Sequence, residues 1–310
     1  MRRTWIAACV LAGLAAAASG GAELQWQGSY DEAVKAAAAG DKIIMALFTT
    51  TTCPYCTKLK EETLADPAVR ASLKGAVLVE MQPGSPGSDE LAARFMVRNV
   101  PAVFFMDAHD GLLGKISGYV PPVRFVEFVN DAKQAAGDFV RKLADYTAKP
   151  SAASGVELVD EYLKRYQRGR IRELLAAVRK LVNEDKDITQ KQRLVLSARL
   201  RIAESFVVLE GAEKPDAATE LLKKAEEEAA AGTDDDVAAR AGFLRAVLLL
   251  EAGRIPESAV LFEAVFSSYP KTQWGALAKR YFDAVRKEMV KAVDEARSKQ
   301  DLPAAGSQSP

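Results

Sequence analysis

Residues 43–56 read IIMALFTTTTCPYC, a short apolar run that leads through four threonines into a Cys-x-x-Cys motif. The apolar run, 43–48, has β-branched members and no charge, which is typical of a strand buried in a parallel sheet. A helical pattern of apolar residues follows Pro54, and proline is well suited to the first position of a helix. The order of strand, Cys-x-x-Cys and helix is the pattern from which we predict the fold.

The segments around this stretch alternate between strand-like and helix-like patterns. Further strands are predicted at 76–81, 102–106 and 112–116, and helices at 30–39, 89–95 and 125–146. Strands that alternate with helices favour a central mixed sheet flanked by helices, which is an α/β architecture.

The spacing of the two cysteines suits redox chemistry. A thiolate attacks a disulfide far better than a thiol does, and the start of a helix stabilises negative charge through its free N–H groups. Cys53 is predicted at such a start, and Cys56 lies in the same first turn, where its sulfur can attack a mixed disulfide formed at Cys53. Pro54 holds the turn stiff, and Tyr55 completes the motif. We therefore predict Cys53 and Cys56 as the catalytic pair.

Residues 26–130 resemble the thioredoxin-like superfamily through the strand 43–48, the motif Cys53-Pro54-Tyr55-Cys56, the pair Val100-Pro101 and Gly118. The resemblance implies that Pro101 is a cis proline. It also implies that Val100 offers backbone hydrogen bonds to an incoming substrate chain, which makes Val100 and Pro101 the predicted substrate-binding residues.

Two positions depart from thioredoxins of that superfamily. The residue before the first cysteine is usually Trp and is Thr52 here, and the buried Asp six residues before that cysteine is replaced by Leu47. In the family this acid assists proton removal from the second cysteine, so in this chain the role falls to water or to another group. Lys58 and Lys60 can add a positive field near the thiols or can be ordinary solvated helix residues.

The N-terminal residues 1–22 have the organisation of a cleavable signal peptide, with basic residues, an apolar run and then small residues. A retained membrane anchor is the alternative, although about 14 apolar residues are short for a span of about 20. Cleavage removes Cys9, leaves Cys53 and Cys56 as the remaining thiols and predicts a periplasmic or other extracytoplasmic location. A disulfide between residues so close in sequence constrains the unfolded chain little, so its value is expected to be chemical.

The thioredoxin-like domain is predicted to span 23–146 and to be followed by a linker at 147–155 (TAKPSAASG), which is small, polar and contains proline. Ala, Glu, Lys, Leu and Arg dominate the sequence beyond it, with apolar residues at helical spacing and no strand candidate. We expect an all-α domain over 156–297 and a disordered tail at 298–310.

Internal repetition marks this second domain. Gly169, Gly211 and Gly253 are spaced 42 residues apart, each between two helix-like stretches. Residues 240–270 resemble a tetratricopeptide repeat, although the period exceeds the usual one and the first two units match poorly. The prediction is a stack of helical hairpins of tetratricopeptide-like (TPR-like) type.

Composition limits the partners and cofactors. The chain has 310 residues, 49% hydrophobic, with 42 basic and 42 acidic residues, so it lacks the basic excess of a nucleic-acid-binding protein. Two cysteines and the single His109 do not make a structural zinc site, and no cofactor or metal is predicted.

Three functions from different classes remain open. The first is an exported thiol–disulfide oxidoreductase that exchanges disulfides with protein clients, which dock on the helical repeats. A reductase of this kind would need a membrane electron-transfer partner, and the motif does not fix the direction of electron flow. The second is a TPR-type interaction protein with a non-catalytic thioredoxin fold. The third is a carrier of soft metal ions in the envelope.

Overall fold

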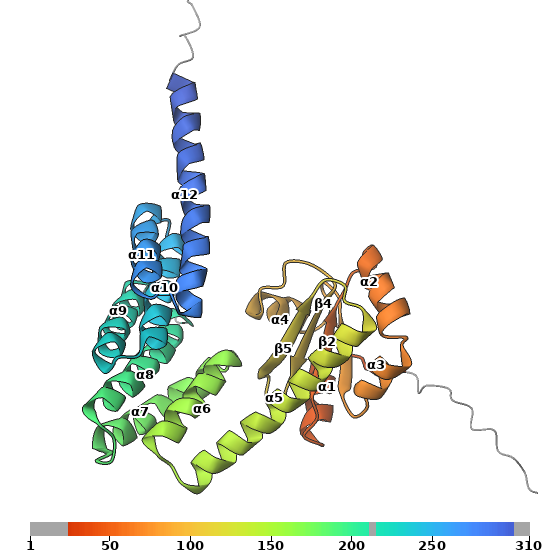
Figure 1. Cartoon of the computed structure of the whole chain (residues 1–310). Helices are drawn as coiled ribbons and strands as arrows, with labels where there is room; N and C mark the ends of the chain where they lie inside the picture. The colour runs from red at the N-terminus through yellow and green to blue at the C-terminus, as the bar shows by residue number, and fades with distance from the viewer. Residues whose placement is uncertain (1–23, 211–214, 301–310) are drawn as a thin grey trace, which may run out of the picture. The chain divides into compact units, whose positions relative to one another are not determined.

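The computed structural model describes residues 24–210 and 215–300, which divide into two compact units (Figure 1). The first unit holds the described residues up to Ala108 together with Gly114–Ala132, and the second holds His109–Leu113 and the residues from Lys133 onward. The predicted signal peptide, 1–22, and the tail residues 301–310 lie outside the described residues.

The first unit is built on a five-stranded sheet with the order β1-β3-β2-β4-β5. Its strands are β1 (Trp26–Gln27), β2 (Ile44–Phe48), β3 (Val77–Met81), β4 (Ala102–Met106) and β5 (Leu112–Ser117). Strand β2 runs parallel to β3 and antiparallel to β4, so the sheet is mixed. The four strands predicted from the sequence are confirmed, and the two-residue strand β1 is an addition.

Helices of the predicted order surround this sheet. They are α1 (Tyr30–Ala38), α2 (Pro54–Lys58), the π-helical segment η1 (Leu59–Thr63), α3 (Pro67–Ser72), α4 (Ser88–Arg94) and α5 (Pro122–Ala148). Prolines stand at the first positions of α2 and α3, where the missing N–H costs nothing.

Aromatic contacts join helix α5 to the sheet and link two neighbouring strands within the sheet. All five residues of β2 are buried. The ring of Phe105 on β4 packs edge-on against Phe125 of α5, with centroids 6.1 Å apart, and Phe48 packs in the same way against Phe104 at 5.5 Å. These contacts fix β2, and therefore the start of α2 beyond it, on a rigid base.

The segment expected to be a linker is mostly helical. Helix α5 extends to Ala148 and helix α6 (Ala152–Lys164) begins only a few residues later, so residues 149–151 alone lie outside helices. Ser151 caps α6 in a reciprocal capping box with Ser154, and Ala152 and Gly155 are buried. The serines and glycine that suggested a linker therefore serve as a helix cap and a close packing point, while the domain boundaries remain a prediction.

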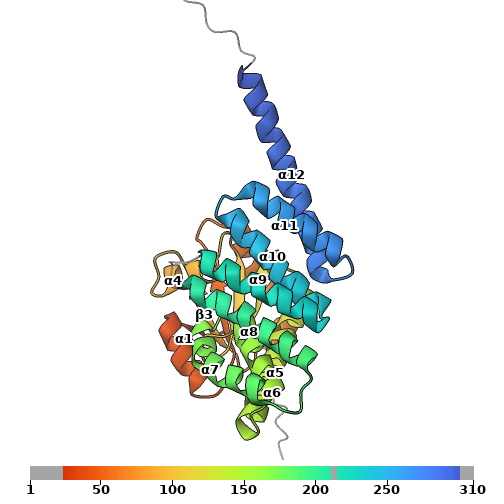
Figure 2. The ribbon, with the colours of Figure 1, turned by 90° about the vertical axis from the view of Figure 1, so that its left-hand side faces the viewer.

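The described residues after Ser117 form helices and no strand. Beyond α5 and α6 these are α7 (Arg168–Glu184), α8 (Gln190–Glu210), α9 (Pro215–Gly232), α10 (Asp235–Glu251), α11 (Ile255–Ser268) and α12 (Gln273–Gln300). Helices that follow one another in sequence pack against one another, and Figure 2 shows α8 to α11 side by side. The expectation of an all-helical region is confirmed, whereas its TPR-like character remains a prediction.

The spaced glycines do not all occupy turns. Gly253 lies between α10 and α11 with φ +75°, a left-handed conformation that glycine adopts without strain. Gly169 was expected between two helix-like stretches and lies instead within the first turn of α7; the turn before α7 contains Tyr166 with φ 58°. Gly211 lies outside the described residues.

Candidate functional site

The two cysteines of the motif form a disulfide at the start of α2. Cys53 is the N-cap residue, with extended backbone angles of φ −92° and ψ 108°, and its Cα lies 5.2 Å from that of Cys56. The backbone N–H of Cys56 points at the Cys53 sulfur across 3.1 Å. A donor at this distance stabilises negative charge on that sulfur when the disulfide is reduced.

The motif is accessible on one side only. Cys53 is half-buried, whereas Cys56 is 2% exposed and Leu59, one turn further on, is fully buried. Pro54 and Tyr55 are exposed, with Tyr55 at 63%. A molecule that reaches this disulfide from solvent therefore meets Cys53 before Cys56.

The Val100–Pro101 peptide bond is cis, as the family resemblance implied. The carbonyl oxygen of Val100 lies 3.7 Å from the Cys53 sulfur, although 47 residues separate them in sequence. The Pro101 carbonyl accepts a hydrogen bond of 2.8 Å from the N–H of Gly118 at the end of β5. The structure therefore brings the predicted catalytic and substrate-binding residues together, while their roles remain predictions.

Side-chain contacts fix the loop that follows β5, which contains Tyr119 and Val120. The hydroxyl of Thr63 donates to the Val120 carbonyl across 2.7 Å, and the hydroxyl of Tyr119 donates to Glu62 across 2.8 Å. The hydrogen bond to Glu62 raises the pKa of Tyr119 above its ordinary value. The ammonium of Lys58 lies 4.6 Å from the centre of the Tyr119 ring. These contacts hold the loop after β5 against α2 and η1, the helical segments that begin at the cysteine motif.

A carboxylate stands next to the position where the family has its buried acid. Leu47 of β2 pairs in register with Glu80 of β3, so both side chains point to the same face of the sheet. Lys60, four residues after Cys56, binds both oxygens of Glu80 at 2.8 Å. The positive charge of Lys60 is therefore directed at Glu80, and this ion pair joins β3 to η1, the helical segment that follows α2.

Analysis of the sequence missed Glu80 and Tyr119. A single charge in the apolar run AVLVEM was a signal for Glu80, since an acid within a buried strand needs a partner. Its neighbours depended on strand register, which the sequence did not specify. Tyr119 carried no signal, because its contact with Glu62 joins residues 57 apart.

The described residues contain no group of three or more His, Cys, Asp or Glu side chains arranged to hold a metal ion. His109 is exposed, in the turn that precedes β5. No helix within 24–210 or 215–300 has the length and apolar character needed to cross a membrane.

Residues 30–133 match the family described as thioredoxin-like domain, and this match agrees with the sheet, the helix-capping Cys-x-x-Cys pair and the cis proline. The N-terminal part of the chain is therefore a thioredoxin-like domain.

Among characterised proteins, the chain is similar to the thiol:disulfide interchange protein DsbD of Ralstonia nicotianae, with 34% identity over 123 residues. That match covers 39% of this chain, and the chain spans only 19% of the length of that relative.

Similar solved structures include a DsbH oxidoreductase, with 25% identity, TM-score 0.31, and coverage of 36% of this chain and 85% of that one. A thioredoxin from Thermus thermophilus has 27% identity and a TM-score of 0.33, with coverage of 37% and 90%. The C-terminal domain of Neisseria meningitidis DsbD in its oxidised form has 18% identity and a TM-score of 0.30, with coverage of 33% and 90%.

Proposed function

We propose that this protein is an exported thiol–disulfide oxidoreductase that works in the periplasm on protein clients. The observation that carries the proposal is the position of the Cys53 sulfur, at the start of a helix and 3.7 Å from the carbonyl of Val100 beside the cis proline. One reactive sulfur and one backbone acceptor for a client chain then lie side by side. The similarity to a thiol:disulfide interchange protein supports the same activity.

The exchange proceeds in two balanced steps in the reducing direction. The Cys53 thiolate attacks a client disulfide; a bond forms between Cys53 and one client sulfur, and the other client sulfur leaves as a thiolate. The Cys56 thiolate then attacks the Cys53 sulfur, which forms the Cys53–Cys56 disulfide and releases the second client thiolate. Two electrons pass from the protein to the client, and the reverse sequence oxidises a client dithiol.

The two sulfurs have different surroundings and therefore different roles in the exchange. The N–H of Cys56 and the free N–H groups of the helix start stabilise the Cys53 thiolate, which is both the attacking group and the leaving group. Burial of Cys56 delays its reaction until the mixed disulfide has formed next to it. Val100 and Pro101 position the client backbone during both steps.

The proposed role of the helical region is to dock the client. Its stacked helices dock the client, which raises the concentration of the client disulfide near Cys53. Electrons for a reductase would come from a membrane electron-transfer partner.

The test is a trapping experiment in the native compartment. In a Cys56→Ser variant the second step cannot occur, so clients should accumulate as covalent adducts with Cys53 that disappear on reduction. A Cys53→Ser variant, with the buried cysteine left intact, is the matched control and should trap few or none. If Cys56→Ser traps nothing and the wild-type protein neither reduces insulin nor oxidises thiols, the enzyme proposal fails and the interaction-protein hypothesis takes its place.

A further inference from the structure

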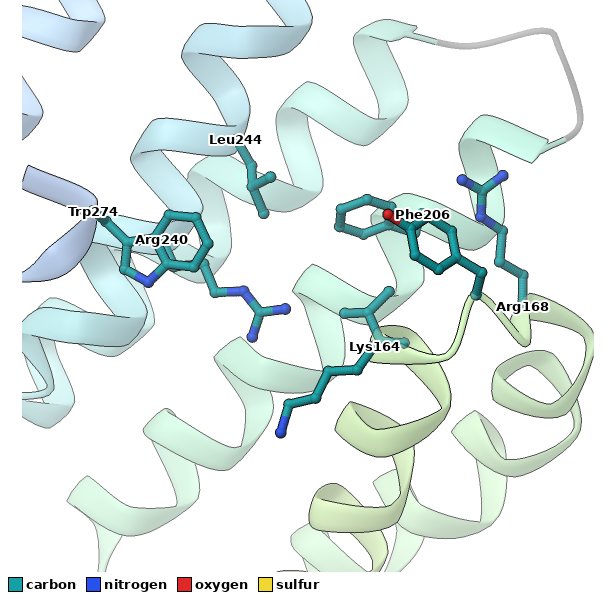
Figure 3. Close-up of a pocket in the computed structure, with 8 residues that line it drawn as sticks. Lys164, Arg168, Phe206, Arg240, Leu244 and Trp274 are labelled. Carbon is teal, nitrogen blue, oxygen red and sulfur yellow. The ribbon is translucent and has the colours of Figure 1, made fainter. Parts of the chain in front are cut away.

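A cavity of about 190 Å³ opens within the helical unit (Figure 3). Its lining residues lie more than 100 positions after the cysteines in the sequence. Its lining comes from the end of α6 and the turn after it, from Arg168 at the start of α7, from α8, from α10 and from the start of α12. The main lining side chains are Lys164, Tyr166, Phe206, Arg240, Leu244 and Trp274. This volume suits one side chain, because sites for drug-sized ligands measure about 300–1,000 Å³.

The chemistry of the lining is apolar and cationic. Leu244 and the rings of Phe206 and Trp274 give it apolar walls, and Figure 3 shows the nitrogens of Arg240 and Lys164 below Leu244 on the same side of the cavity. No Asp or Glu of the described residues lines it. A ligand that fills this space gains most when it combines an apolar stem with negative charge.

The positive charge here exceeds the negative charge that neutralises it. Asp160 of α6 binds Arg199 at 2.6 Å and also faces Arg240 at 3.9 Å. Two guanidinium groups therefore share one carboxylate, with the exposed Asp236 contributing at longer range.

The same arrangement occurs at the next residue of α6. Glu161 binds Lys142 at 2.6 Å and Lys164 at 3.1 Å, so two ammonium groups share a second carboxylate. With Asp236 counted at longer range, these four cations and three acids leave a surplus of one positive charge.

One buried donor of the lining residues lacks a partner, and one buried cation is poorly hydrated. The indole N–H of Trp274 is buried and has no acceptor among the residues that the structure describes. Burial lowers the pKa of Arg240 from its ordinary value, which reflects the loss of water around its guanidinium group. A buried donor without an acceptor destabilises the folded protein, and a bound ligand that supplies an acceptor removes this cost.

We propose that this cavity binds the carboxylate of an acidic residue in a peptide segment of a partner protein, flanked by an apolar residue that contacts Phe206 and Leu244. The carboxylate pairs with Arg240 and Lys164, and Trp274 supplies a further donor. This inference rests on the proposed function only in treating the partner as a client, since the binding itself needs no cysteine.

The test measures binding of short peptides to the full chain by fluorescence anisotropy. The probe is a fluorescein-labelled, C-terminally amidated peptide of sequence Gly-Ser-Leu-Glu-Phe-Ser-Gly, compared with the same peptide carrying Gln in place of Glu. We expect the Glu peptide to bind at least about tenfold more tightly, because it alone brings a charge-assisted acceptor. Lys164→Gln should weaken binding of the Glu peptide several-fold, and Arg240→Gln should weaken it further.

Lys180→Gln is the matched control, because it removes the same charge from an exposed position of α7 outside the cavity lining. Lys164 is exposed, so its variant tests the proposal even if Arg240→Gln fails to fold. Equal affinity for the two peptides, binding of neither, or an equal loss in Lys180→Gln would each overturn the proposal. Preference for a Gln peptide with a free C-terminal carboxylate would overturn it too, since the ligand would then be a chain terminus.

A variant with both Cys53→Ser and Cys56→Ser separates this inference from the proposed function. It cannot exchange disulfides, and it should bind the Glu peptide as the wild-type chain does. Loss of peptide selectivity with disulfide exchange intact would reject the cavity proposal alone.

Discussion

The two sulfurs of the motif have different surroundings, and we expect them to react at different rates. Cys53 is half-buried and receives the N–H of Cys56, whereas Cys56 is 2% exposed. In the reduced protein, iodoacetamide should modify Cys53 at least about tenfold faster than Cys56, because the attacking species is an accessible thiolate. Peptide mapping by mass spectrometry after brief alkylation measures the ratio. Faster modification of Cys56 would contradict the assignment of Cys53 as the attacking group.

Glu80 lies beside Leu47, the position where the family resemblance implies an acid, and it binds Lys60 of η1. If Glu80 assists proton removal from Cys56, Glu80→Gln should slow release of the mixed disulfide by about tenfold or more. Quenched-flow kinetics measure the rate of this second step. Lys60→Met is the control that breaks the ion pair while leaving the carboxylate. An unchanged rate of the second step in Glu80→Gln would exclude this role.

The sequence was sufficient to predict the residues of the motif but not all of their neighbours. Cys53, Cys56 and Pro54 follow each other within one turn, so local spacing predicted their arrangement. The position of Val100 came from the family resemblance, and that of Glu80 depended on the register of β2 and β3. A one-residue change of register would move Glu80 to the other face of the sheet, and local spacing does not determine register.

At the scale of elements, α6 lies very close to its neighbours at Gly155. A Cβ on this residue would lie 2.9 Å from both γ-carbons of Val178 and 3.1 Å from the ring of Tyr146. Gly155→Ala should therefore lower the free energy of unfolding of the helical unit by about 1–3 kcal/mol, since a branched, fully buried side chain must shift. The melting transition of this unit, followed by calorimetry, measures the effect.

Gly137→Ala in α5 is the matched control, because no atom lies within 4 Å of its added Cβ. This substitution should raise the free energy of unfolding by about 0.5–1 kcal/mol through helix propensity. Destabilisation by both substitutions to the same extent would show that the close contact at Gly155 is unimportant.

The ion pairs of Glu161 connect α5 and α6 and should depend on pH. Burial by itself would raise the pKa of Glu161, but hydrogen bonds from Lys142 and Lys164, with their charges, outweigh it and lower the pKa. Because the folded pKa lies below the unfolded value of about 4.3, this stabilisation is present above that pH and is lost as pH falls through the folded pKa. Glu161→Gln should cost about 1 kcal/mol at pH 7.

The difference between wild-type protein and Glu161→Gln should therefore disappear in acid. Calorimetry at pH 7 and at successive values below about pH 4.3 makes this comparison. A difference that grew as the pH fell would contradict the assigned direction of the pKa shift.

Element positions could largely be predicted, because hydrophobic periodicity fixes them locally. The apolar runs at 43–48 and 102–106 became β2 and β4. Helix ends were predicted less well around 147–155, where small residues resembled a linker. Their burial against α7 is a tertiary effect that composition does not reveal.

At the scale of the whole molecule, the chain joins a thioredoxin-like domain to a helical unit that contains a cationic, apolar cavity. The amino-acid pattern predicted both kinds of architecture. It did not predict the cavity, whose lining residues come from five helices and lie up to about 110 positions apart, between Leu163 and Trp274. Only packing of those helices brings the cations together.

The central claim is reversible disulfide exchange that begins at Cys53. The most direct measurement mixes the reduced protein with a peptide that contains one disulfide, quenches with acid and quantifies every thiol and disulfide species by mass spectrometry. We predict that the protein becomes oxidised as the peptide becomes reduced and that the reverse mixture reaches the same ratio. Cys56→Ser should stop at a Cys53–peptide adduct, and Cys53→Ser should be inactive. Unchanged reactants, in a protein whose Cys53 remains open to alkylation, would contradict the claim.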